Sequence, residues 1–410
     1  DKEDPGENSA RESLAELMQS SVDYRMISDV PVGSFLSGGL DSSILVSLMA
    51  EKHPDAIKTF TIGFNDEGFN EFDHARSVSE HCGTTHKEIT LNANSYLNSL
   101  EDMIRVKDSP LAVPNEIALH VLSKVLKKDI TVVLSGEGAD ELFGGYGRIF
   151  RSAFDYQRVM KDGLSINNEK LKKNLLQKYD SLSFSGELEH FLGQYSYMSF
   201  GEKEKILSPS AFKFLGDDPH NSNYFENYWK RLDGLDLHEK YIWIFQNVHL
   251  EGLLGRLDSA TMSASVEGRV PFVDHRLIES INALPVHYKM RWLNDKSRDD
   301  AKVLNSDQIS EVYDTTKYIL RSQYQDRLPI EISQRKKIGF PVPLTNWLSG
   351  PLRTYASDRL LNENARTREI FEKEYIQTII NSAKTDAQSG LKIWMLLNVE
   401  EWMRIYEVSI

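Results

Sequence analysis

The stretch SFLSGGLDSSILVSLM, residues 34–49, decides the fold because it joins an apolar strand to a helix through a glycine-rich turn. An apolar run at residues 30–36 predicts the buried strand, and helical periodicity over residues 41–53 predicts the helix. In a parallel sheet such a turn lies at the carboxyl end of its strand, which is where ligands bind. Free N–H groups at a helix start attract anions, so the turn predicts a phosphate site.

The composition of this turn narrows the kind of phosphate site. The Walker A pattern G-x-x-x-x-G-K-[ST] occurs nowhere in the chain, and the turn does not match G-x-G-x-x-G. Asp41 would repel a phosphate unless a divalent cation lay between them, which points to Mg²⁺. From the chemistry alone, a plain Gly-Ser turn with a helix cap stays open as the alternative.

The segments around the turn predict an α/β fold with a doubly wound parallel sheet. Further strands are expected at residues 57–64, 86–91 and 130–136, each separated from the next by a helical segment. From about Phe150 this alternation stops and the chain is expected to be mostly helical. The expected divisions are a linker, or else the start of the enzymatic region, at 1–12, an α/β core at 13–150 and a helical part at 151–410.

A second loop, LSGEGADELFGGYGR at residues 134–148, again follows an apolar strand and carries Glu137, Asp140 and Glu141. If both loops lie at one sheet edge, Asp41 and Asp140 share one Mg²⁺. For any single acid, a solvated loop carboxylate is the alternative. The predicted site therefore depends on the two loops meeting.

Three further segments carry charge. QRKKIGFPVPLTNW, residues 334–347, forms either a basic lip over a phosphate site or a solvated face. Glu267 and Arg269 lie between apolar residues and form either a structural ion pair or part of a substrate pocket. The polar stretch at residues 291–311 is expected to be a solvated surface excursion.

Composition excludes several classes of protein. The 410 residues carry a net charge of −13, which argues against nucleic acid as the main partner. No apolar stretch is long enough to cross a membrane, so no membrane is expected. The one cysteine, Cys82, fits a reducing, cytoplasmic setting. No spacing supports a structural zinc site, and G-x-S-x-G is absent.

Six segments, taken together, resemble a known family. In chain order they are SGGLDSS, TFTIGF, LSGEGADELFGGY, SVEGRVPFVDHRLIE, TKYILRSQYQDRLP and RKKIGFPVPLTNWL. The first alone resembles the pyrophosphate loop of PP-loop ATP pyrophosphatases, the adenine-nucleotide alpha-hydrolase type of fold. The combination resembles the synthetase domain of class B, glutamine-dependent asparagine synthetases, from about Asp29 to about Trp347.

The resemblance implies an AMP-forming carbon–nitrogen ligase. The carboxylate of an acid attacks the α-phosphate of MgATP and releases pyrophosphate, and ammonia then displaces AMP from the acyl-adenylate. By this resemblance, pyrophosphate is held by Ser37, Gly38, Gly39, Asp41, Ser42 and Ser43, and adenosine by Phe35, Ile62, Ser135 and Gly136.

The resemblance also implies roles for the charged residues. Asp41 and Asp140 would bind Mg²⁺. Glu137 matches the acid that positions or deprotonates ammonia, and Lys337 matches the lysine that steadies the phosphorus transition state. By the same resemblance, Tyr146 would belong to the ATP-binding region, and Glu267 and Arg269 would belong to the substrate-binding region.

The expected acid is aspartate, which would give asparagine. An amidotransferase that acts on a sugar uronate or a peptide acid is the alternative, and a non-catalytic relative is a third. The family commonly has Ala where this chain has Gly268, and the stretch at 291–311 is longer than in typical members. Both departures are expected near the part of the site that binds the acid substrate, so they bear on whether that acid is aspartate.

The ammonia source is a further expectation. The family's glutaminase domain begins with a catalytic cysteine, whereas Asp1 opens this chain. We expect free ammonia, ammonia from another chain, or a glutaminase domain in a longer protein, which the linker-like start favours. The sequence does not decide the oligomeric state, for which a homodimer stays open.

Overall fold

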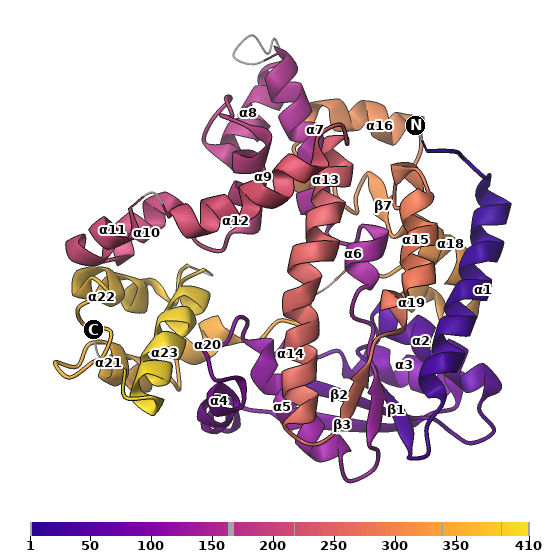
Figure 1. The fold of residues 1–410 in the computed structure, drawn as a ribbon, viewed down its shortest axis with the longest axis horizontal. Helices are drawn as coiled ribbons and strands as arrows, with labels where there is room; N and C mark the ends of the chain where they lie inside the picture. Colours follow the sequence, from indigo (N-terminus) through magenta and orange to yellow (C-terminus); the bar gives the residue numbers. More distant parts are fainter. Residues whose placement is uncertain (1, 163–167, 217, 338, 387, 409–410) are drawn as a thin grey trace.

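The computed structural model describes every residue except 1, 163–167, 217, 338, 387 and 409–410. Asp1 of the expected linker and Ile338 of the expected lip therefore lie outside the described residues. A parallel sheet lies at one side of the molecule (Figure 1). Its strands are β1 (Val32–Phe35), β2 (Lys58–Phe64), β3 (Thr85–Leu91), β4 (Val132–Leu134) and β5 (Glu267–Arg269).

The strand order β3-β2-β1-β4-β5 confirms the doubly wound fold. The chain runs outward from β1 to β3 and then returns to place β4 on the other side of β1. The order therefore reverses between β1 and β4, and ligands bind at such a switch point. Ser34 of β1 pairs in register with Leu134 of β4, so the loops that follow these two strands start side by side.

Helices cover both faces of the sheet. The first helices are α1 (Glu7–Met26), α2 (Leu40–Lys52), α3 (Phe72–Cys82), α4 (Ala93–Lys107), α5 (Asn115–Leu126) and α6 (Ala139–Phe143). Val132 and Leu134 of β4 pack into the core with α1, α2 and α3, whereas Val133 packs into the opposite core with α4 and α5. This alternation follows from the two-residue period of a strand.

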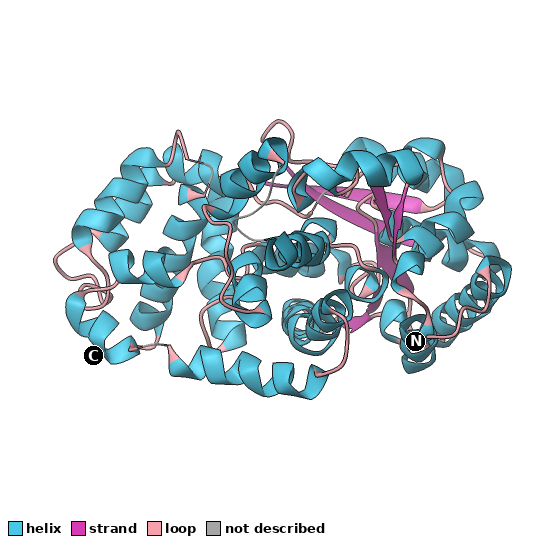
Figure 2. Ribbon diagram, turned by 90° about the horizontal axis from the view of Figure 1, so that it is seen from above, coloured by secondary structure: helices cyan, strands magenta, loops and turns pink. Residues whose placement is uncertain are grey.

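The middle of the chain is helical, as predicted. Its elements are α7 (Gly147–Asp162), α8 (Glu169–Tyr179), α9 (Glu187–Tyr195), α10 (Phe200–Ile206), α11 (Pro209–Leu215), α12 (Pro219–Trp229), α13 (Leu237–Ile244), the π-helix η3 (Phe245–His249), α14 (Leu250–Met262) and α15 (His275–Ala283). Aromatic side chains of α7, α9, α12 and α13 form a separate core here. Figure 2 shows the strands gathered toward one end of the molecule and helices filling the other.

The last part returns to the sheet. Its elements are β6 (Met290–Trp292), α16 (Asp295–Asp300), α17 (Ser306–Ile309), β7 (Asp314–Thr316), α18 (Tyr318–Tyr324), α19 (Ile330–Ser333), α20 (Leu344–Ser349), α21 (Arg353–Leu360), α22 (Lys373–Ser382) and α23 (Ser389–Ile405). Side chains of α20 to α23 share the core of α4 and α5, and β5 joins the sheet. Residues 151–410 therefore contribute to the same cores as residues 13–150. Among the described helices, none has the length and apolar composition that a bilayer crossing requires.

Two expectations need correction. The expected linker at 1–12 is helical from Glu7 onward, because the Glu7 carboxylate anchors the start of α1. It accepts hydrogen bonds from the Tyr318 hydroxyl at 2.7 Å and from Arg291 at 2.8 Å. These two partners lie far along the chain, so the sequence around Glu7 does not reveal them.

The stretch at 291–311 is a solvated excursion only in part: residues 293–300 are mostly exposed, whereas the part from Ala301 onward is packed. The stretch begins on β6, which pairs antiparallel with β7. In the segment that connects these two strands, Ala301, Leu304 and Ile309 form a small buried cluster. Arg158 of α7 donates hydrogen bonds to the carbonyl oxygens of Ala301 and Leu304. This part of the stretch is therefore packed against α7, and it leads directly to the start of α18.

Candidate active site

A pocket of about 1060 Å³ opens at the carboxyl ends of β1, β2 and β4. The predicted residues that line it are Phe35, Ser37, Gly39, Asp41, Ser42, Ile62, Ser135, Gly136, Glu137, Asp140, Tyr146 and Lys337. Gly38 and Ser43 belong to the same turn but do not line the pocket. The two loops therefore meet at one sheet edge, as the sequence analysis requires.

The first loop is held by its own hydroxyl groups. The Ser43 hydroxyl donates to the Gly39 carbonyl oxygen at 2.7 Å, and the Ser42 hydroxyl donates to it at 3.2 Å. Gly38 has φ +69° and packs against His74, where a Cβ would lie 2.5 Å from the His74 Cβ. At Gly39, the N-cap of α2, no side chain caps the helix, so N–H groups at its start are free for an anion.

Glycines of the second loop bring its acid residues close to the first loop. A Cβ on Gly136 would lie 3.2 Å from the Cβ of Asp41, tighter than most side-chain contacts. Gly145 packs against the carboxylate of Asp140, and a Cβ there would overlap it. Larger residues at these positions would separate the two carboxylates.

Lys317 joins Asp41 and Asp140. Its ammonium lies 2.6 and 2.7 Å from the two carboxylate oxygens of Asp41 and 2.7 Å from Asp140 Oδ1. Only 4% of the Lys317 side chain is exposed. The residue lies between β7 and α18, so the packed stretch before β7 is what delivers this cation to the pocket.

Lys337 also contacts the carboxylate of Asp140. Burial alone would raise the pKa of Asp140, but Lys317 and Lys337 outweigh burial and hold this pKa well below its usual range. Burial alone would lower the pKa of Lys337, but Asp140 and Asp41 outweigh it and raise this pKa. The Asp140 carboxylate and the Lys337 ammonium are therefore both charged at neutral pH, and the cations Lys317 and Lys337 both face the first loop.

The ring of Tyr146 lies beneath Lys337, whose ammonium is 5.1 Å from the ring centroid. The Tyr146 hydroxyl donates to Glu141 Oε1 at 2.6 Å. Burial, together with the charge of Asp140, raises the pKa of Glu141 to about 7. Glu141 thus holds the Tyr146 ring in position through this hydrogen bond.

Glu137 forms an ion pair with Arg256 of α14. Arg256 also donates a hydrogen bond to Asn115 Oδ1 at 3.0 Å. The Arg256 side chain is 8% exposed and that of Glu137 is 21% exposed, so the carboxylate remains open to the pocket on one side. A base for an incoming amine would occupy such a position.

The basic stretch at 334–347 lies over the pocket, but its cations differ. Arg335 is largely buried and clasps the first loop, with bonds to the Gly38 carbonyl oxygen at 3.1 Å and to Glu71 at 2.6 Å. Lys336 is exposed, and Lys337 reaches Asp140. Arg321 of α18 holds the stretch in place by donating to the Arg335 carbonyl oxygen at 3.0 Å.

Glu267 and Arg269 do not come to the pocket. They lie on the edge strand β5 and form an ion pair with each other at 2.7 Å. Arg269 also donates to the carbonyl oxygens of Arg25 and Ile27, each at 2.8 Å. Of the two interpretations, the structural ion pair accounts for these contacts.

The donor set fits a magnesium ion that is shared with a phosphate. Among the described residues, no three His, Cys, Asp or Glu side chains gather closely enough to hold a metal by themselves. Asp41 and Asp140 supply two hard carboxylates, and Mg²⁺ typically completes such a set with water and phosphate oxygens. The Lys317 ammonium between them demonstrates that the position suits a cation.

Sequence reasoning missed Lys317 and Arg256 as parts of the site, and it included Arg335 only as one cation of the possible basic lip. Lys317 and Arg335 lie inside segments that carry the family resemblance, which was the available signal for them. None has a partner nearby in the chain: Lys317 and Asp41 are 276 residues apart. Only the folded chain reveals what these cations neutralise.

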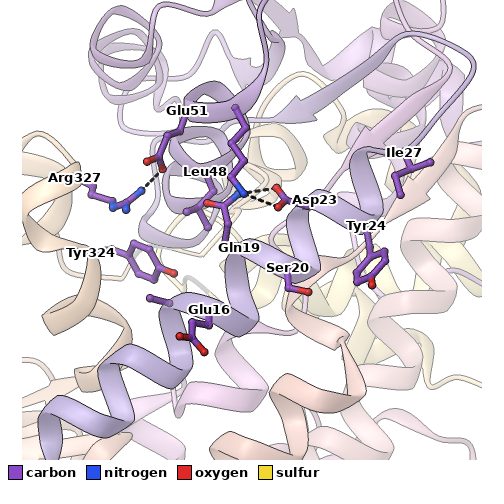
Figure 3. Close-up of a pocket in the computed structure, with 12 residues that line it drawn as sticks. Glu16, Gln19, Ser20, Asp23, Tyr24, Ile27, Leu48, Glu51, Tyr324 and Arg327 are labelled. Atoms are coloured by element: carbon purple, nitrogen blue, oxygen red, sulfur yellow. Dashed lines mark hydrogen bonds and ion pairs between the residues drawn. The ribbon is translucent and has the colours of Figure 1, made fainter.

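A second hollow, of about 790 Å³, lies between α1, α2 and the end of α18 (Figure 3). Ion pairs occupy its walls: Lys52 with Asp23 at 2.7 Å and Arg327 with Glu51 at 2.5 Å. None of the predicted site residues lines it. The candidate active site is therefore the pocket at the strand ends.

A family model described as asparagine synthase matches residues 13–404. This chain belongs to the asparagine synthase family. Asparagine synthetase [glutamine-hydrolyzing] 1 of Bacillus subtilis is 30% identical over 405 residues, which cover 96% of this chain and 59% of that protein. The resemblance that the six segments carry is thus confirmed at the level of the family.

Other relatives of this asparagine synthase family member include a second named synthetase and a protein named as an amidase. The putative asparagine synthetase [glutamine-hydrolyzing] of Mycobacterium tuberculosis is 30% identical over 356 residues, 84% of this chain and 50% of that protein. The amidase chry2 of Gibberella zeae is 21% identical over 433 residues, 97% of this chain and 62% of that protein. The chain thus spans less than two thirds of the length of these curated relatives.

Proposed function

We propose that this chain catalyses ATP-dependent amide synthesis. The carboxylate of an acid attacks the α-phosphate of ATP, and pyrophosphate leaves. Ammonia then attacks the carbonyl carbon of the acyl-adenylate, and AMP leaves with the two electrons of the broken C–O bond. The observation that carries the proposal is the cluster of Asp41, Asp140, Lys317 and Lys337 at the start of α2.

The position of each residue around the pocket indicates which part of ATP it would bind. The free N–H groups at the start of α2 and the hydroxyls of Ser37 and Ser42 hold the departing pyrophosphate. Lys337 stabilises negative charge that grows on the phosphate oxygens in the transition state. Phe35, Ile62 and the loop after β4 supply the wall against which the adenosine packs.

Asp41 and Asp140 are the residues that would hold Mg²⁺. When bound, the ion would neutralise charge on the pyrophosphate leaving group. Glu137 accepts a proton from the attacking ammonia, and its pairing with Arg256 holds the carboxylate at the pocket for this step.

Aspartate is the acid that the names of the synthetase relatives suggest, and asparagine would be its product. Those names also include glutamine hydrolysis, so a glutaminase domain or chain is the proposed ammonia source. A second candidate is another carboxylate, such as a sugar uronate or a peptide acid. It is favoured by the aromatic lining of one side of the pocket.

The test is to incubate the protein with MgATP, ammonium and aspartate, and to measure AMP, pyrophosphate and asparagine. We expect AMP and pyrophosphate in equal amounts, and the Asp140→Asn variant should lose turnover while remaining folded. Formation of ADP and phosphate would contradict attack at the α-phosphate. ATP binding without turnover on any acid would favour a non-catalytic relative.

A further inference from the structure

One side of the active-site pocket, away from the sheet, is built from rings. We call it the aromatic wall. It consists of Tyr146, Tyr195, Tyr197, Phe225, Phe245 and His249. The rings come from α9 and the turn after it, from α12, from η3 and from the loop before α7. Of these six residues, only Tyr146 is among the predicted site residues.

Five rings of the wall contact one another in a continuous set, in which Phe225 and Phe245 are buried and Tyr146, Tyr195 and His249 are half-buried. The Tyr146 ring lies 4.7 Å from that of Phe245 and 5.5 Å from that of His249, measured between centroids. The hydroxyl of Tyr195 and Nδ1 of His249 are 3.1 Å apart, within hydrogen-bond distance. Tyr195 also packs edge-on against Phe225, with centroids 5.7 Å apart. These contacts fix the rings before any ligand arrives.

The wall begins where the reacting carboxylate must lie. Tyr146 is its innermost ring, and Lys337 lies over this ring while contacting Asp140. An acid that reaches the phosphate beside Lys337 therefore places the rest of its body along the wall. At the other end, Tyr197 is 63% exposed, so the wall runs from the reacting centre to the mouth of the pocket.

The charges around the wall do not suit a free amino acid. The carboxylates that line the described part of the pocket are Asp41, Glu71, Glu137 and Asp140, and each forms an ion pair with a lining cation. The α-ammonium of aspartate would need an acid partner when it leaves water, and each of these acids already faces a cation. Glu137 is the most open of them, with 21% of its side chain exposed, and it is the proposed base for ammonia. Burial, together with Arg256, lowers the pKa of His249 to about 4, so the wall is uncharged at neutral pH.

We propose that the aromatic wall binds the ring of the acid substrate, which bears the reacting carboxylate and no other charge. The acid substrate is then a ring-bearing monocarboxylic acid that is larger than aspartate. Two sources share this chemistry: a pyranose uronate, whose apolar face stacks on rings, and an aromatic acid. This inference rests on the proposed amide synthesis, and it selects the second candidate acid over aspartate.

The test compares three acids in pyrophosphate release with MgATP and ammonium: glucuronate, phenylacetate and aspartate. We expect one ring acid to exceed aspartate in kcat/KM by about tenfold or more, since one good ring contact is worth about that factor. The difference between glucuronate and phenylacetate identifies the source. Aspartate as the best acid would overturn the inference.

A matched pair of variants tests the wall itself. Tyr197→Ala removes a ring that is 63% exposed in the wall, and Tyr24→Ala removes one that is 62% exposed outside the pocket. Tyr197→Ala should raise KM for the ring acid severalfold while the Kd for ATP stays unchanged, and Tyr24→Ala should change neither. Equal KM values in both variants would overturn the role of the wall.

Calorimetric binding of the acids separates this inference from the proposed function. A ring acid that binds, and binds more weakly to Tyr197→Ala, but yields no pyrophosphate would overturn amide synthesis and uphold the wall. Turnover of aspartate that is indifferent to Tyr197→Ala would uphold amide synthesis and overturn the wall. Neither binding nor turnover of any acid would overturn both.

Discussion

Lys317 donates hydrogen bonds to both carboxylate oxygens of Asp41, at 2.7 and 2.6 Å, although 276 residues separate the two in the chain. The same ammonium lies 2.7 Å from Asp140. Two carboxylates from the two loops are thus neutralised by an internal cation at the point where a metal and phosphates are proposed to bind. This arrangement holds the two carboxylates close together before a nucleotide arrives, and the cations lower the pKa of Asp140.

Replacing Lys317 by Met should leave Asp41 and Asp140 with Lys337 as their remaining cation. We expect the free energy of unfolding to fall by roughly 3 kcal/mol, as for a buried ion pair that loses one partner. Mg²⁺ should raise the melting temperature of this variant more than that of the natural protein, because the ion can replace the ammonium. The measurement is thermal unfolding with and without Mg²⁺.

Lys302→Met is the matched control. Lys302 pairs with Asp299 at 2.7 Å, but both side chains are more than two-thirds exposed. Its loss should leave the free energy of unfolding nearly unchanged, because water screens an exposed ion pair. Equal effects of the two substitutions, or an equal response to Mg²⁺, would contradict the role given to Lys317.

Replacing Gly145 by Ala should displace the Asp140 carboxylate. The new Cβ would overlap Asp140 Oδ1 and would lie 2.5 Å from Cε of Lys317. We expect loss of pyrophosphate release and a lower melting temperature. Gly252→Ala on α14 is the control, since a Cβ there meets nothing within 4 Å and should stabilise the helix by up to about 1 kcal/mol. Normal turnover by Gly145→Ala would show that Asp140 is not needed in its observed position.

Replacing Glu137 by Gln should separate the two chemical steps. The amide cannot accept a proton, so attack by ammonia should slow by about a hundredfold or more. Adenylation needs no such base and should persist, so the yield of amide per pyrophosphate should fall. Parallel measurement of pyrophosphate and amide tests this. An unchanged ratio would assign the base to another residue.

The raised pKa of Glu141 predicts a pH dependence of stability. Its pKa shifts from 4.5 to about 7, so between these values the folded state binds more protons than the unfolded state. The free energy of unfolding should therefore decrease as the pH rises through this window and then level off above pH 7.

Glu141→Gln should flatten that part of the stability profile, because the amide still accepts the Tyr146 hydroxyl bond but does not titrate. Melting temperatures measured from about pH 5 to pH 8 test this expectation. The exposed Glu279 of α15 is the control, and Glu279→Gln should leave the profile unchanged. Identical profiles for the natural protein and Glu141→Gln would refute the shift.

The parts of the fold that sequence reasoning predicted have local causes. The alternation of apolar strands with amphipathic helices identified β1 through β4, because burial period and turn composition are encoded within each segment. The packing of residues 301–309 within the stretch at 291–311 escaped prediction. Their burial depends on α7, and in particular on Arg158, whose bonds to backbone carbonyls replace the water that polar residues usually need.

The same division applies to the site. The two loops with Asp41, Glu137 and Asp140 follow from motif chemistry and from their positions after strands, whereas Lys337 was expected from the family resemblance. Glu267 and Arg269 do not join them, because β5 lies at the sheet edge and its charges satisfy one another. A pair of charges between apolar residues carries no local signal that distinguishes these two outcomes.

The sequence by itself determined the sheet, the position of the phosphate loop and the acids that face it, because each depends on residues within a few positions of one another. Only the tertiary structure decided which cations meet those acids. Lys317, Arg256 and Arg335 reach them from distant parts of the chain, and burial demands that each charge find a partner. The partner is selected by packing in three dimensions.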